Sequence, residues 1–559
     1  MTTMLSLQEG MSVQAELRPD ATALVWRGER TSYAELETTT NRLARLLREN
    51  GCGCGDRVAI LMPKTPTAIV AMLGVLKTGA AYVPLEPTDP ALRLMRILRS
   101  ADCRWILCAG PVADTLKEVL AAAKPQREPL IGWLDEDVPP VAPPAVFALH
   151  DLAAFATGPI ASANRPDDLA HLMFSAGSTG VPKGVMITHE SVARFVLWAK
   201  KYFGITNADR IANHSPLRYD VSTFDIFGTL WSGAELHLVP PELNSLPHEL
   251  ADFIRDSRLT QWFSVPAALN LIAKFDALRD PDFPELKRVL FAGEVLPTST
   301  LMYWMQRAPH ARFTNLYGPA ETTISSSYFT VPERPTDPRQ PIPLGYACEG
   351  EELLVLDARL RPCGDGQTGD LYIRGVGVSP GYWRDPDKTQ AAFVADPGGP
   401  DGARLYKTGD RARRDAQGVL YFCGRGDTQI KSRGHRIELG EIEAALNSLT
   451  ELCESAVIAI DSCSFETNLI CCAYAPARGV AITPREIRAR LAELVRPHML
   501  PVRWKEYDLL PRNGNGKVDR ALLKAAFTHE EIVGDRGRIT AVRSTAISAT
   551  AQLPAADPS

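Results

Sequence analysis

The chain alternates short apolar runs, often rich in β-branched residues, with longer stretches in which apolar positions recur every three or four residues. Nearly every position is apolar at 56–62 and 81–86, which predicts two buried strands, and 66–79 between them has the length and composition of a helix. Further strands are expected at 234–239, 287–293, 351–357 and 370–375. Strands that alternate with helices are typical of an α/β fold with largely parallel sheets.

One helix start is clearly marked at Thr188. A threonine hydroxyl can accept a hydrogen bond from the first turn of a helix, and Val192, Phe195, Val196 and Ala199 follow at the spacing of one helix face. This pattern predicts a helix that begins after residue 188 and buries that face.

The pattern changes near residue 424, where a charged stretch precedes two predicted strands at 455–461 and 469–476 and an amphipathic helix at 484–499. From Thr528 onward the chain is rich in Ala, Ser, Thr and Pro, a composition typical of disorder. We therefore predict a large α/β N-terminal lobe at 1–426, a small mobile α+β lobe at 427–527 and a disordered tail at 528–559.

Composition narrows the class of protein. The 559 residues carry 61 Lys and Arg against 66 Asp and Glu, a net charge of −5, which argues against a nucleic-acid partner. No run approaches the ~20 apolar residues that span a bilayer, so no membrane partner is expected. The first residues lack the pattern of a secretory signal, and a cytoplasmic location is expected.

Residues 174–185 read FSAGSTGVPKGV, a composition that suits a loop around an anion. Glycines allow close approach of backbone N–H groups, hydroxyls donate hydrogen bonds and lysine adds positive charge. The loop is not a Walker P-loop, because two residues separate Gly180 from Lys183 and Gly184 follows the lysine.

A second motif, Gly377 to Gly381, fits the G-x-S-x-G pattern of serine hydrolases. In that motif the residue after the serine donates its backbone N–H to the oxyanion hole. Here that residue is Pro380, which has no N–H, and we reject the hydrolase interpretation.

Six polar motifs follow one another in a fixed order, at 174–185, 315–323, 369–383, 406–410, 424–443 and 511–520. Each alone is typical of a solvated loop. Together they resemble the signatures of the adenylate-forming superfamily, and most closely those of the amino-acid adenylation domains of non-ribosomal peptide synthesis. The resemblance covers residues from about 10 to 525.

The resemblance implies a ligase that joins a carboxylic acid to ATP, releases pyrophosphate and passes the acyl group to a thiol, with ATP and Mg²⁺ as cofactors. Ser178, Thr179 and Lys183 match the residues nearest the β- and γ-phosphates. Glu321 matches the magnesium-associated carboxylate, and Thr322 matches an α-phosphate contact.

The same resemblance supplies the remaining nucleotide contacts and the catalytic residue. The implied adenosine contacts are Gly293, Asn315, Tyr317, Asp410, Phe422 and Arg425. Lys517 matches the catalytic lysine between the substrate carboxylate and the reacting phosphate. Asp427 matches the hinge between the lobes, and Gly434 matches the face that the small lobe presents for thioester formation.

The substrate is expected to be an amino acid. In residues 214–227, HSPLRYDVSTFDIF, Asp220 matches the aspartate that contacts the substrate ammonium, although an exposed turn aspartate is the alternative. The other matching pocket positions are Val221, Phe224, Phe263, Leu290, Ala292, Leu316, Ile324 and Ser325. All but the serine are apolar, which favours a small or medium neutral side chain. The combination of Leu290, Ala292 and Leu316 resembles free-standing prolyl-activating enzymes, so L-proline comes first.

The expected partner is a separate carrier protein that bears a phosphopantetheine thiol. The sequence shows neither the attachment serine of a carrier domain nor the HHxxxD run of a condensation domain. A stand-alone ligase that loads a carrier protein in trans is therefore predicted. Two alternatives stay open: an acyl- or aryl-CoA ligase on the same fold, and a catalytically silent binding protein.

Overall fold

The structure is a computed structural model that describes residues 6–123, 128–175, 182–400, 402–426, 429–432, 434–461, 468–512 and 518–533. Residues 1–510 and 511–559 form two compact units, and each is described by itself. The predicted division after residue 426 stays a prediction.

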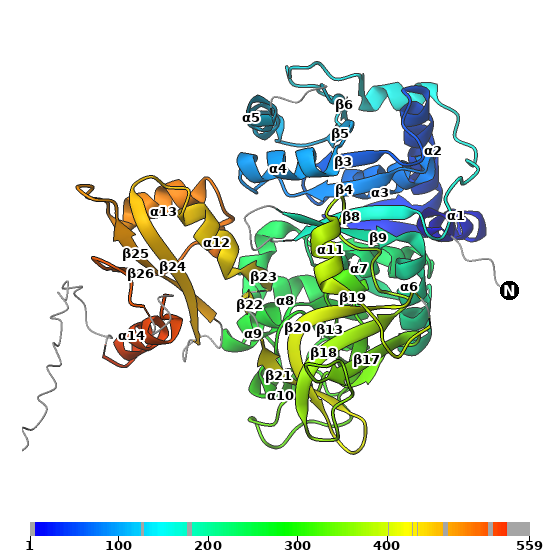
Figure 1. Cartoon of the computed structure of the whole chain (residues 1–559). Coiled ribbons are helices and arrows are strands. Elements are labelled where there is room, and N and C mark those ends of the chain that lie inside the picture. The colour runs from blue at the N-terminus through cyan, green and yellow to red at the C-terminus, as the bar shows by residue number, and fades with distance from the viewer. Residues whose placement is uncertain are drawn as a thin grey trace, which may run out of the picture. The chain divides into compact units, whose positions relative to one another are not determined.

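A seven-stranded sheet occupies the N-terminal part of the first unit (Figure 1). In spatial order its strands are β7 (Phe147–Ala148), β6 (Leu130–Trp133), β5 (Trp105–Cys108), β3 (Arg57–Leu61), β4 (Ala81–Leu85), β8 (Leu169–Ser175) and β9 (Lys183–Thr188). All neighbours are parallel except β8 and β9. The strands predicted at 56–62 and 81–86 are confirmed as β3 and β4.

A nine-stranded sheet follows, with most of its strands in the later part of the large lobe. Its order is β16 (Tyr346–Ala347), β15 (Ser327–Thr330), β14 (Arg312–Tyr317), β13 (Arg288–Ala292), β12 (Gln261–Ser264), β10 (Arg210–Asn213), β11 (Glu235–Leu238), β1 (Thr22–Trp26) and β2 (Glu29–Ser32). The strands from β14 to β1 are parallel, and the sheet ends in antiparallel strands on both sides.

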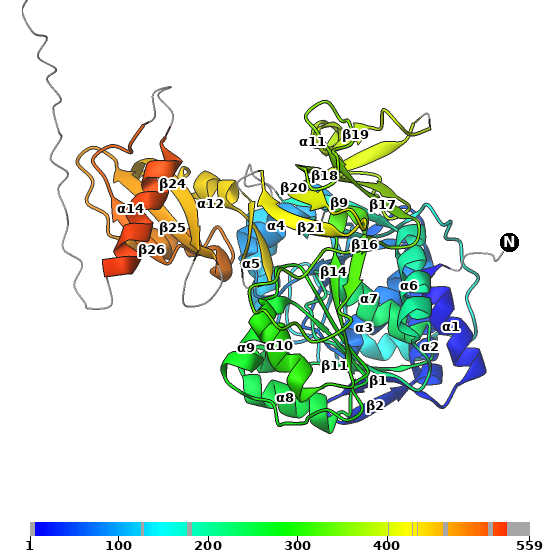
Figure 2. The same cartoon turned by 90° about the horizontal axis from the view of Figure 1, so that it is seen from below.

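Helices pack on both faces of each sheet (Figures 1 and 2). Between the sheets lie α1 (Leu7–Leu17), α2 (Tyr33–Glu49), α3 (Pro66–Thr78), α6 (His189–Phe203) and α7 (Asp220–Leu230). Outside the first sheet are α4 (Ala91–Ala101) and α5 (Ala113–Ala123), and outside the second are α8 (Pro247–Asp256), α9 (Pro266–Lys274) and α10 (Thr298–Arg307).

Alternate side chains of each central strand contribute to the core on opposite faces of its sheet. In β13, Leu290 and Ala292 face the helices between the sheets, whereas Val289 and Phe291 face α8 to α10. Successive side chains of a strand point to opposite faces, so a strand buried on both faces is apolar throughout. This explains why the apolar run at 287–293 signals a central strand.

The helix predicted after Thr188 is confirmed as α6. The Thr188 hydroxyl accepts from the Ser191 N–H at 3.2 Å, and the predicted face from Val192 to Ala199 is buried. A side-chain cap of this kind satisfies one of the N–H groups that a helix start leaves without a partner.

A third sheet corrects the expectation of largely parallel sheets. It contains β17 (Glu351–Leu356), β18 (Thr368–Gly375), β20 (Arg404–Arg414), β19 (Phe393–Ala395) and β21 (Leu420–Arg425), and all of its pairs are antiparallel. The connection from β17 to β18, residues 357–367, has no helix. A parallel crossover needs about a dozen residues or more, usually with a helix, so the short connection makes this pair antiparallel.

The remainder of the first unit is α+β. It holds the hairpin β22 (Gln429–Ser432) and β23 (His435–Glu438), α12 (Leu439–Leu446), and a sheet of β24 (Leu452–Asp461), β25 (Asn468–Pro476) and β26 (Arg503–Glu506). Both predicted strands are confirmed. The helix predicted at 484–499 is shorter: α13 spans Pro484–Ala492, because Arg496 precedes a proline and is extended.

The described part of the second unit is mainly α14 (Arg520–Val533). Its start is preceded by a bridge between Arg512 and Val518 and a 2.7 Å hydrogen bond from the Asp519 N–H to the Pro511 carbonyl. Residues 528–533 of the predicted tail are helical, and residues 534–559 lie outside the described residues.

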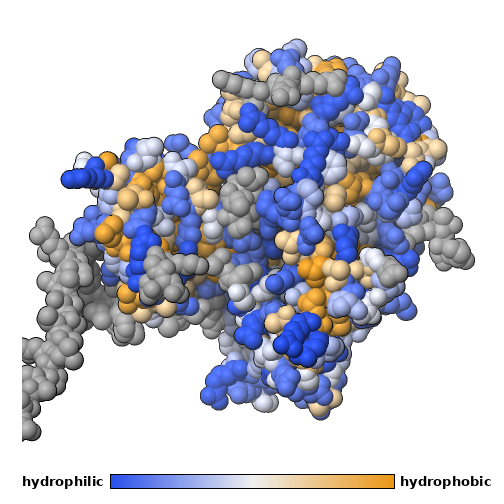
Figure 3. All heavy atoms as spheres, viewed as in Figure 1, coloured by the Kyte–Doolittle hydropathy of each residue, from blue (hydrophilic) through white to orange (hydrophobic). Residues whose placement is uncertain are grey.

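No helix in the described part of the chain combines the length and the apolar character that crossing a bilayer requires. The face shown in Figure 3 interleaves hydrophilic residues with small apolar patches.

Candidate active site

A cavity of about 670 Å³ lies at the carboxyl ends of the parallel strands of the nine-stranded sheet. His214 follows β10, Val265 follows β12, Gly293 follows β13 and Gly318 follows β14, and all four border the cavity. In open α/β sheets, ligands bind at this edge because loops from several strands converge there. The topology therefore makes this cavity the candidate active site.

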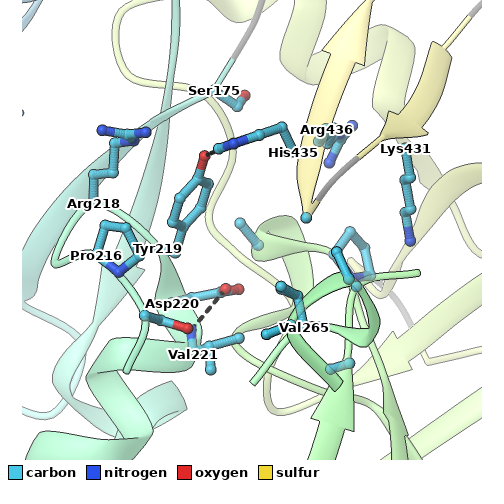
Figure 4. A pocket seen from close by; sticks show the side chains of 18 of the residues that line it. Ser175, Pro216, Arg218, Tyr219, Asp220, Val221, Val265, Lys431, His435 and Arg436 are labelled. Atoms are coloured by element: carbon cyan, nitrogen blue, oxygen red, sulfur yellow. Dashed lines mark hydrogen bonds between the residues drawn. The ribbon is translucent and has the colours of Figure 1, made fainter. Parts of the chain in front are cut away.

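The hairpin β22–β23 forms a second wall of the cavity, to which Lys431, Gly434, His435 and Arg436 contribute (Figure 4). Gly434 has a φ of +79°, and a Cβ atom there would come within 2.8 Å of Val265 Cγ2. Both the backbone conformation and the contact require glycine at this position. The structure thus places the predicted Gly434 inside the cavity.

Asp220 is the first residue of α7, and its carboxylate borders the cavity (Figure 4). Oδ1 accepts from the Val221 N–H at 3.0 Å, and Oδ2 accepts from the Ile324 N–H at 3.3 Å. Burial raises the pKa of Asp220 to about 6, although these two hydrogen bonds lower it. At neutral pH the site therefore presents a largely ionised carboxylate between apolar walls.

The residues predicted to surround a substrate side chain lie near one another. Of the eight, all within the described part of the chain, Val221 and Ala292 border the cavity, and the others are buried behind it: Phe224, Phe263, Leu290, Leu316, Ile324 and Ser325. The rings of Phe224 and Phe263 meet edge to face at a centroid distance of 6.0 Å. The apolar members belong to or pack against a single core cluster, which fixes the wall beside Asp220.

Three of the predicted adenosine contacts are joined by hydrogen bonds. The Tyr317 hydroxyl donates to Asp410 Oδ2 at 2.5 Å, and the Arg425 guanidinium donates to Asp410 Oδ1. These three residues and Gly293 border the cavity, and the Lys431 ammonium lies 5.6 Å from the centre of the Tyr317 ring. Aromatic ring, carboxylate and guanidinium are thus fixed together on one side.

Two other predicted adenosine contacts, Asn315 and Phe422, do not border the cavity. Asn315 is buried in β14, and its amide donates to the Pro343 carbonyl at 2.7 Å. Phe422 lies in β21 and is 36% exposed.

The predicted phosphate side contains a dense set of charges. Glu321 is fully buried, and its carboxylate accepts from the Tyr382 hydroxyl at 2.9 Å and from Arg436 Nη1 at 2.7 Å. Burial alone would raise the pKa of Glu321, but Arg436 and Lys183 lower it to about 2. The Lys183 ammonium lies 3.8 Å from a carboxylate oxygen of Glu438. Thr322, next to Glu321, is buried and accepts from the Ser326 hydroxyl at 2.8 Å.

Four predicted site residues lie outside the described residues: Ser178, Thr179, Asp427 and Lys517. Their roles remain predictions.

Sequence reasoning missed several residues that border the cavity, among them His214, Tyr219, Val265, Lys431, His435 and Arg436. Two signals were available. His214 and Val265 directly follow the parallel strands β10 and β12, which were not predicted, at the edge where a parallel sheet collects its site residues. The other signal is the charge of the stretch that contains Lys431, His435 and Arg436, which is too high for a core strand. In a hairpin, alternate side chains point to opposite faces, so at least one face of this hairpin must meet a polar surface.

Ser379, the serine of the rejected hydrolase motif, is a structural residue. Its hydroxyl is buried and donates to the Met186 carbonyl at 2.7 Å. It links the loop after β18 to β9.

Comparison with known proteins identifies the family in which this architecture occurs. The model of the AMP-binding enzyme family matches residues 11–383, well over half of the chain. A dimodular nonribosomal peptide synthase of Bacillus subtilis (strain 168) is 34% identical over 529 residues, which are 93% of this chain and 21% of that protein. The chain thus spans about a fifth of the length of this relative.

Two solved structures share the fold. The Vibrio cholerae adenylation domain AlmE, crystallised with glycyl-adenosine-5'-phosphate, has a TM-score of 0.80 at 24% identity, with 94% of this chain and 98% of AlmE covered. Holo-PA1221, which contains adenylation and PCP domains, has a TM-score of 0.74 at 25% identity, with 93% and 84% covered. The family match and the shared large and small lobes confirm the resemblance: the chain belongs to the AMP-binding enzyme family and has the fold of its adenylation domains.

Proposed function

We propose that the chain activates a small neutral amino acid as its aminoacyl-AMP and transfers the acyl group to the phosphopantetheine thiol of a separate carrier protein. The observation that carries this proposal is Asp220, a carboxylate at the cavity wall between apolar side chains. An ammonium group next to a half-buried carboxylate gains a charge-assisted hydrogen bond, and an acid without that group leaves the carboxylate unpaired.

In the first step a carboxylate oxygen of the amino acid attacks the α-phosphorus of ATP, and the bond to the departing pyrophosphate breaks. Both reactants are anionic, so catalysis depends on alignment and on positive charge. Tyr317, Asp410 and Arg425 would hold the adenosine through the ring face and the ribose hydroxyls. Lys517 would oppose the charge that develops between carboxylate and phosphate.

Ser178, Thr179 and Lys183 would contact the β- and γ-phosphates and Thr322 the α-phosphate. Asn315 and Phe422 would contact the adenosine only after a local rearrangement, because the Asn315 amide donates a hydrogen bond to the Pro343 carbonyl and the Phe422 ring is exposed.

Glu321 fits the chemistry of a Mg²⁺ ligand. It is a buried oxygen donor that Arg436 and Lys183 keep ionised. Mg²⁺ usually binds one or two carboxylates together with substrate phosphates rather than an all-protein cage. The described residues contain no group of three or more His, Cys, Asp and Glu side chains suited to a metal. The metal would neutralise charge on the phosphates.

For the amino acid itself we propose L-proline first and other small neutral amino acids next. Val221 and Ala292 present apolar side chains to the cavity that Asp220 borders, and the buried pair of Phe224 and Phe263 belongs to the core behind this wall. The glycyl adenylate bound by AlmE supports a small substrate for a protein of this fold. Such pockets discriminate one methylene by only ~1–3 kcal/mol, so close analogues should compete.

In the second step the thiol sulfur attacks the acyl carbon, AMP leaves and the thiol proton is released. The adenylation and PCP domains of PA1221 support a carrier protein as the acceptor. The small lobe would turn at Asp427 between the two steps, bringing Gly434 into the cavity for the second. Asp427→Pro should then slow thioester formation and spare adenylation, and an equal loss of both steps would contradict the hinge.

The test is ATP–pyrophosphate exchange across the twenty amino acids. We expect exchange with proline above all others, and none with benzoates or fatty acids. Exchange with benzoates or fatty acids instead would favour the CoA-ligase alternative. Those acids carry no ammonium group that could pair with Asp220. A complete lack of acyl-AMP with amino, aryl and fatty acids would establish the silent binding protein.

A further inference from the structure

A group of charged side chains, four of them buried and two partly buried, joins the large lobe to the small one beside the cavity. We call it the buried charge cluster, and its members are Glu86, Asp89, Arg93, Arg218, Glu441 and Arg496. Along the chain, the first four lie between β4 and α7 in the large lobe. Glu441 lies in α12 and Arg496 follows α13, both in the small lobe.

The contact between Asp89 and Arg496 is bidentate. Arg496 Nε lies 3.0 Å from each carboxylate oxygen, and Nη2 donates to Oδ2 at 2.8 Å. Paired geometry of this kind fixes the direction of both side chains as well as their distance. Both side chains are almost fully buried, with 4% of Asp89 and 8% of Arg496 exposed.

Two further ion pairs extend the cluster. Arg93 Nη1 donates to Glu441 at 2.6 Å, which is a second contact between the lobes, and Arg218 lies 2.8 Å from Glu86 within the large lobe. Three carboxylates thus face three guanidinium groups. Burial alone would raise the pKa of Asp89, but Arg496, Arg218 and Arg93 hold it below its usual value.

Arg218 and Arg496 of the cluster border the candidate active site directly, and aromatic rings link them to the hairpin β22–β23. The Arg218 guanidinium lies 5.0 Å from the centre of the Tyr219 ring, and the Tyr219 hydroxyl is 2.6 Å from His435 Nδ1. The His435 ring stacks on His498 at a centroid distance of 3.5 Å. His498 is two residues after Arg496, so the contact with Asp89 and the position of His435 are mechanically linked.

The hydrogen bonding of the cluster is not that of an element optimised for stability alone. Among the described residues, Arg93 Nη2 and Glu441 Oε2 are buried without a hydrogen-bond partner. Buried ion pairs often stabilise a fold no better than apolar side chains of the same volume. Buried ion pairs do fix the relative position of the two lobes, because a movement of the small lobe would leave buried charges without partners.

We propose that the buried charge cluster positions the segment Gly434–Arg436 in the cavity, and that Asp89 and Glu441 are positioning residues for the thioester-forming step. This inference rests on the proposed two-step function. It assigns to Asp89 and Glu441, which do not border the cavity, the task of holding the small lobe where Gly434 meets Val265 and His435 meets Tyr219.

The experiment measures the two steps separately in Asp89→Asn and Glu441→Gln. The first step is proline-dependent ATP–pyrophosphate exchange, and the second is acylation of D-pantetheine, used as the thiol probe. We expect exchange within about twofold of the unmodified protein. We expect acylation to fall at least tenfold in Asp89→Asn, with a higher KM for pantetheine, and to fall less in Glu441→Gln, because Glu441 accepts one hydrogen bond from Arg93 whereas Asp89 accepts three from Arg496.

The matched control is Asp282→Asn. Asp282 also makes a buried bidentate pair, accepting from Arg255 Nε at 3.0 Å and Nη2 at 2.7 Å, but both partners lie in the large lobe. This variant should lower the unfolding midpoint as Asp89→Asn does and leave the ratio of the two steps unchanged. Arg496→Lys, which keeps the charge and loses the fork, gives an intermediate acylation rate and serves if Asp89→Asn does not fold.

The outcomes separate the two proposals. If the unmodified protein shows no exchange with any amino acid, the proposed function is wrong and this inference falls with it. If exchange is present but Asp89→Asn and Arg496→Lys change both steps by one factor, or no more than Asp282→Asn, the cluster is structural and the positioning role is wrong.

Discussion

The region proposed for the amino acid and the region proposed for the phosphates, which we call the amino-acid end and the phosphate end, are built on different principles. At the amino-acid end, one carboxylate, Asp220, lies against apolar side chains that belong to the large-lobe core. At the phosphate end, Glu321, Lys183, Arg436 and Glu438 form a charge network to which both lobes contribute. The first end is fixed by packing, and the second would change if the small lobe moved.

This difference separates selection from chemistry. A wall formed by the core would keep its shape during both proposed reaction steps, so it could select a side chain throughout. A charge network completed by a hairpin can present different cations to the phosphates in different arrangements of the lobes. Four predictions test this comparison.

The largest effect is expected at the phosphate end, in Lys517→Ala. Loss of a cation that opposes developing charge should lower amino-acid-dependent exchange by about a hundred- to a thousandfold. The circular dichroism spectrum and unfolding midpoint should stay unchanged. Lys201→Ala, at an exposed position of α6, is the control. Near-normal exchange in Lys517→Ala would show that the decisive cation lies elsewhere.

The next effect is expected at the amino-acid end, in Asp220→Ala. A hydrogen bond to a charged group contributes about 1.5–3 kcal/mol, so kcat/KM for the amino acid should fall by about ten- to 150-fold. The loss should appear mainly in KM for the amino acid, with KM for ATP unchanged. If the variant instead loses affinity for ATP, the assignment of Asp220 to the amino acid is wrong.

A smaller effect is expected where the ends meet, in Gly434→Ala. The added Cβ would lie 2.8 Å from Val265 Cγ2 on a backbone with φ +79°, so the hairpin must withdraw. Acylation of pantetheine should fall about tenfold while exchange stays near normal. Combining it with Val265→Ala, which makes room, should restore part of the rate. A lack of any restoration would assign the loss to backbone strain.

The smallest effect is a pH dependence confined to the amino-acid end. The pKa of Asp220 is raised to about 6, so its carboxylate gains a proton and loses its charge as pH falls through that value. KM for the amino acid should rise below pH 6 by about tenfold per pH unit, with a plateau above pH 7. Asp220→Ala should abolish the dependence, and a flat profile from pH 5 to 7 in the unmodified protein would contradict it.

The sequence predicted the elements whose patterns are local. The strands β3, β4, β13, β24 and β25 and the capped helix α6 were predicted because apolar runs and the cap at Thr188 are properties of adjacent residues. The antiparallel third sheet was missed because pairing direction depends on the connections rather than on the strands. The early end of α13 depends on Pro497, a local signal that the apolar periodicity obscured.

The candidate site shows the same limit. Asp220, Val221 and Ala292, which the resemblance assigns to the substrate pocket, border the cavity, and their role stays a prediction. Partners were not predictable: that Arg436 pairs with Glu321, or that Tyr219 meets His435, follows from how distant segments fold together. Periodicity carries no information about such contacts.

The bonded trio of Tyr317, Asp410 and Arg425 has a consequence for the thermodynamics of nucleotide binding. These side chains hold one another in place, so their rotamers are restricted in the folded chain itself. Immobilising a rotamer-rich side chain on binding costs about 0.5–1.5 kcal/mol, and here that loss of freedom accompanies folding instead. An adenosine bound here would meet a rigid template, and its affinity would depend on how well its ring and diol match that template.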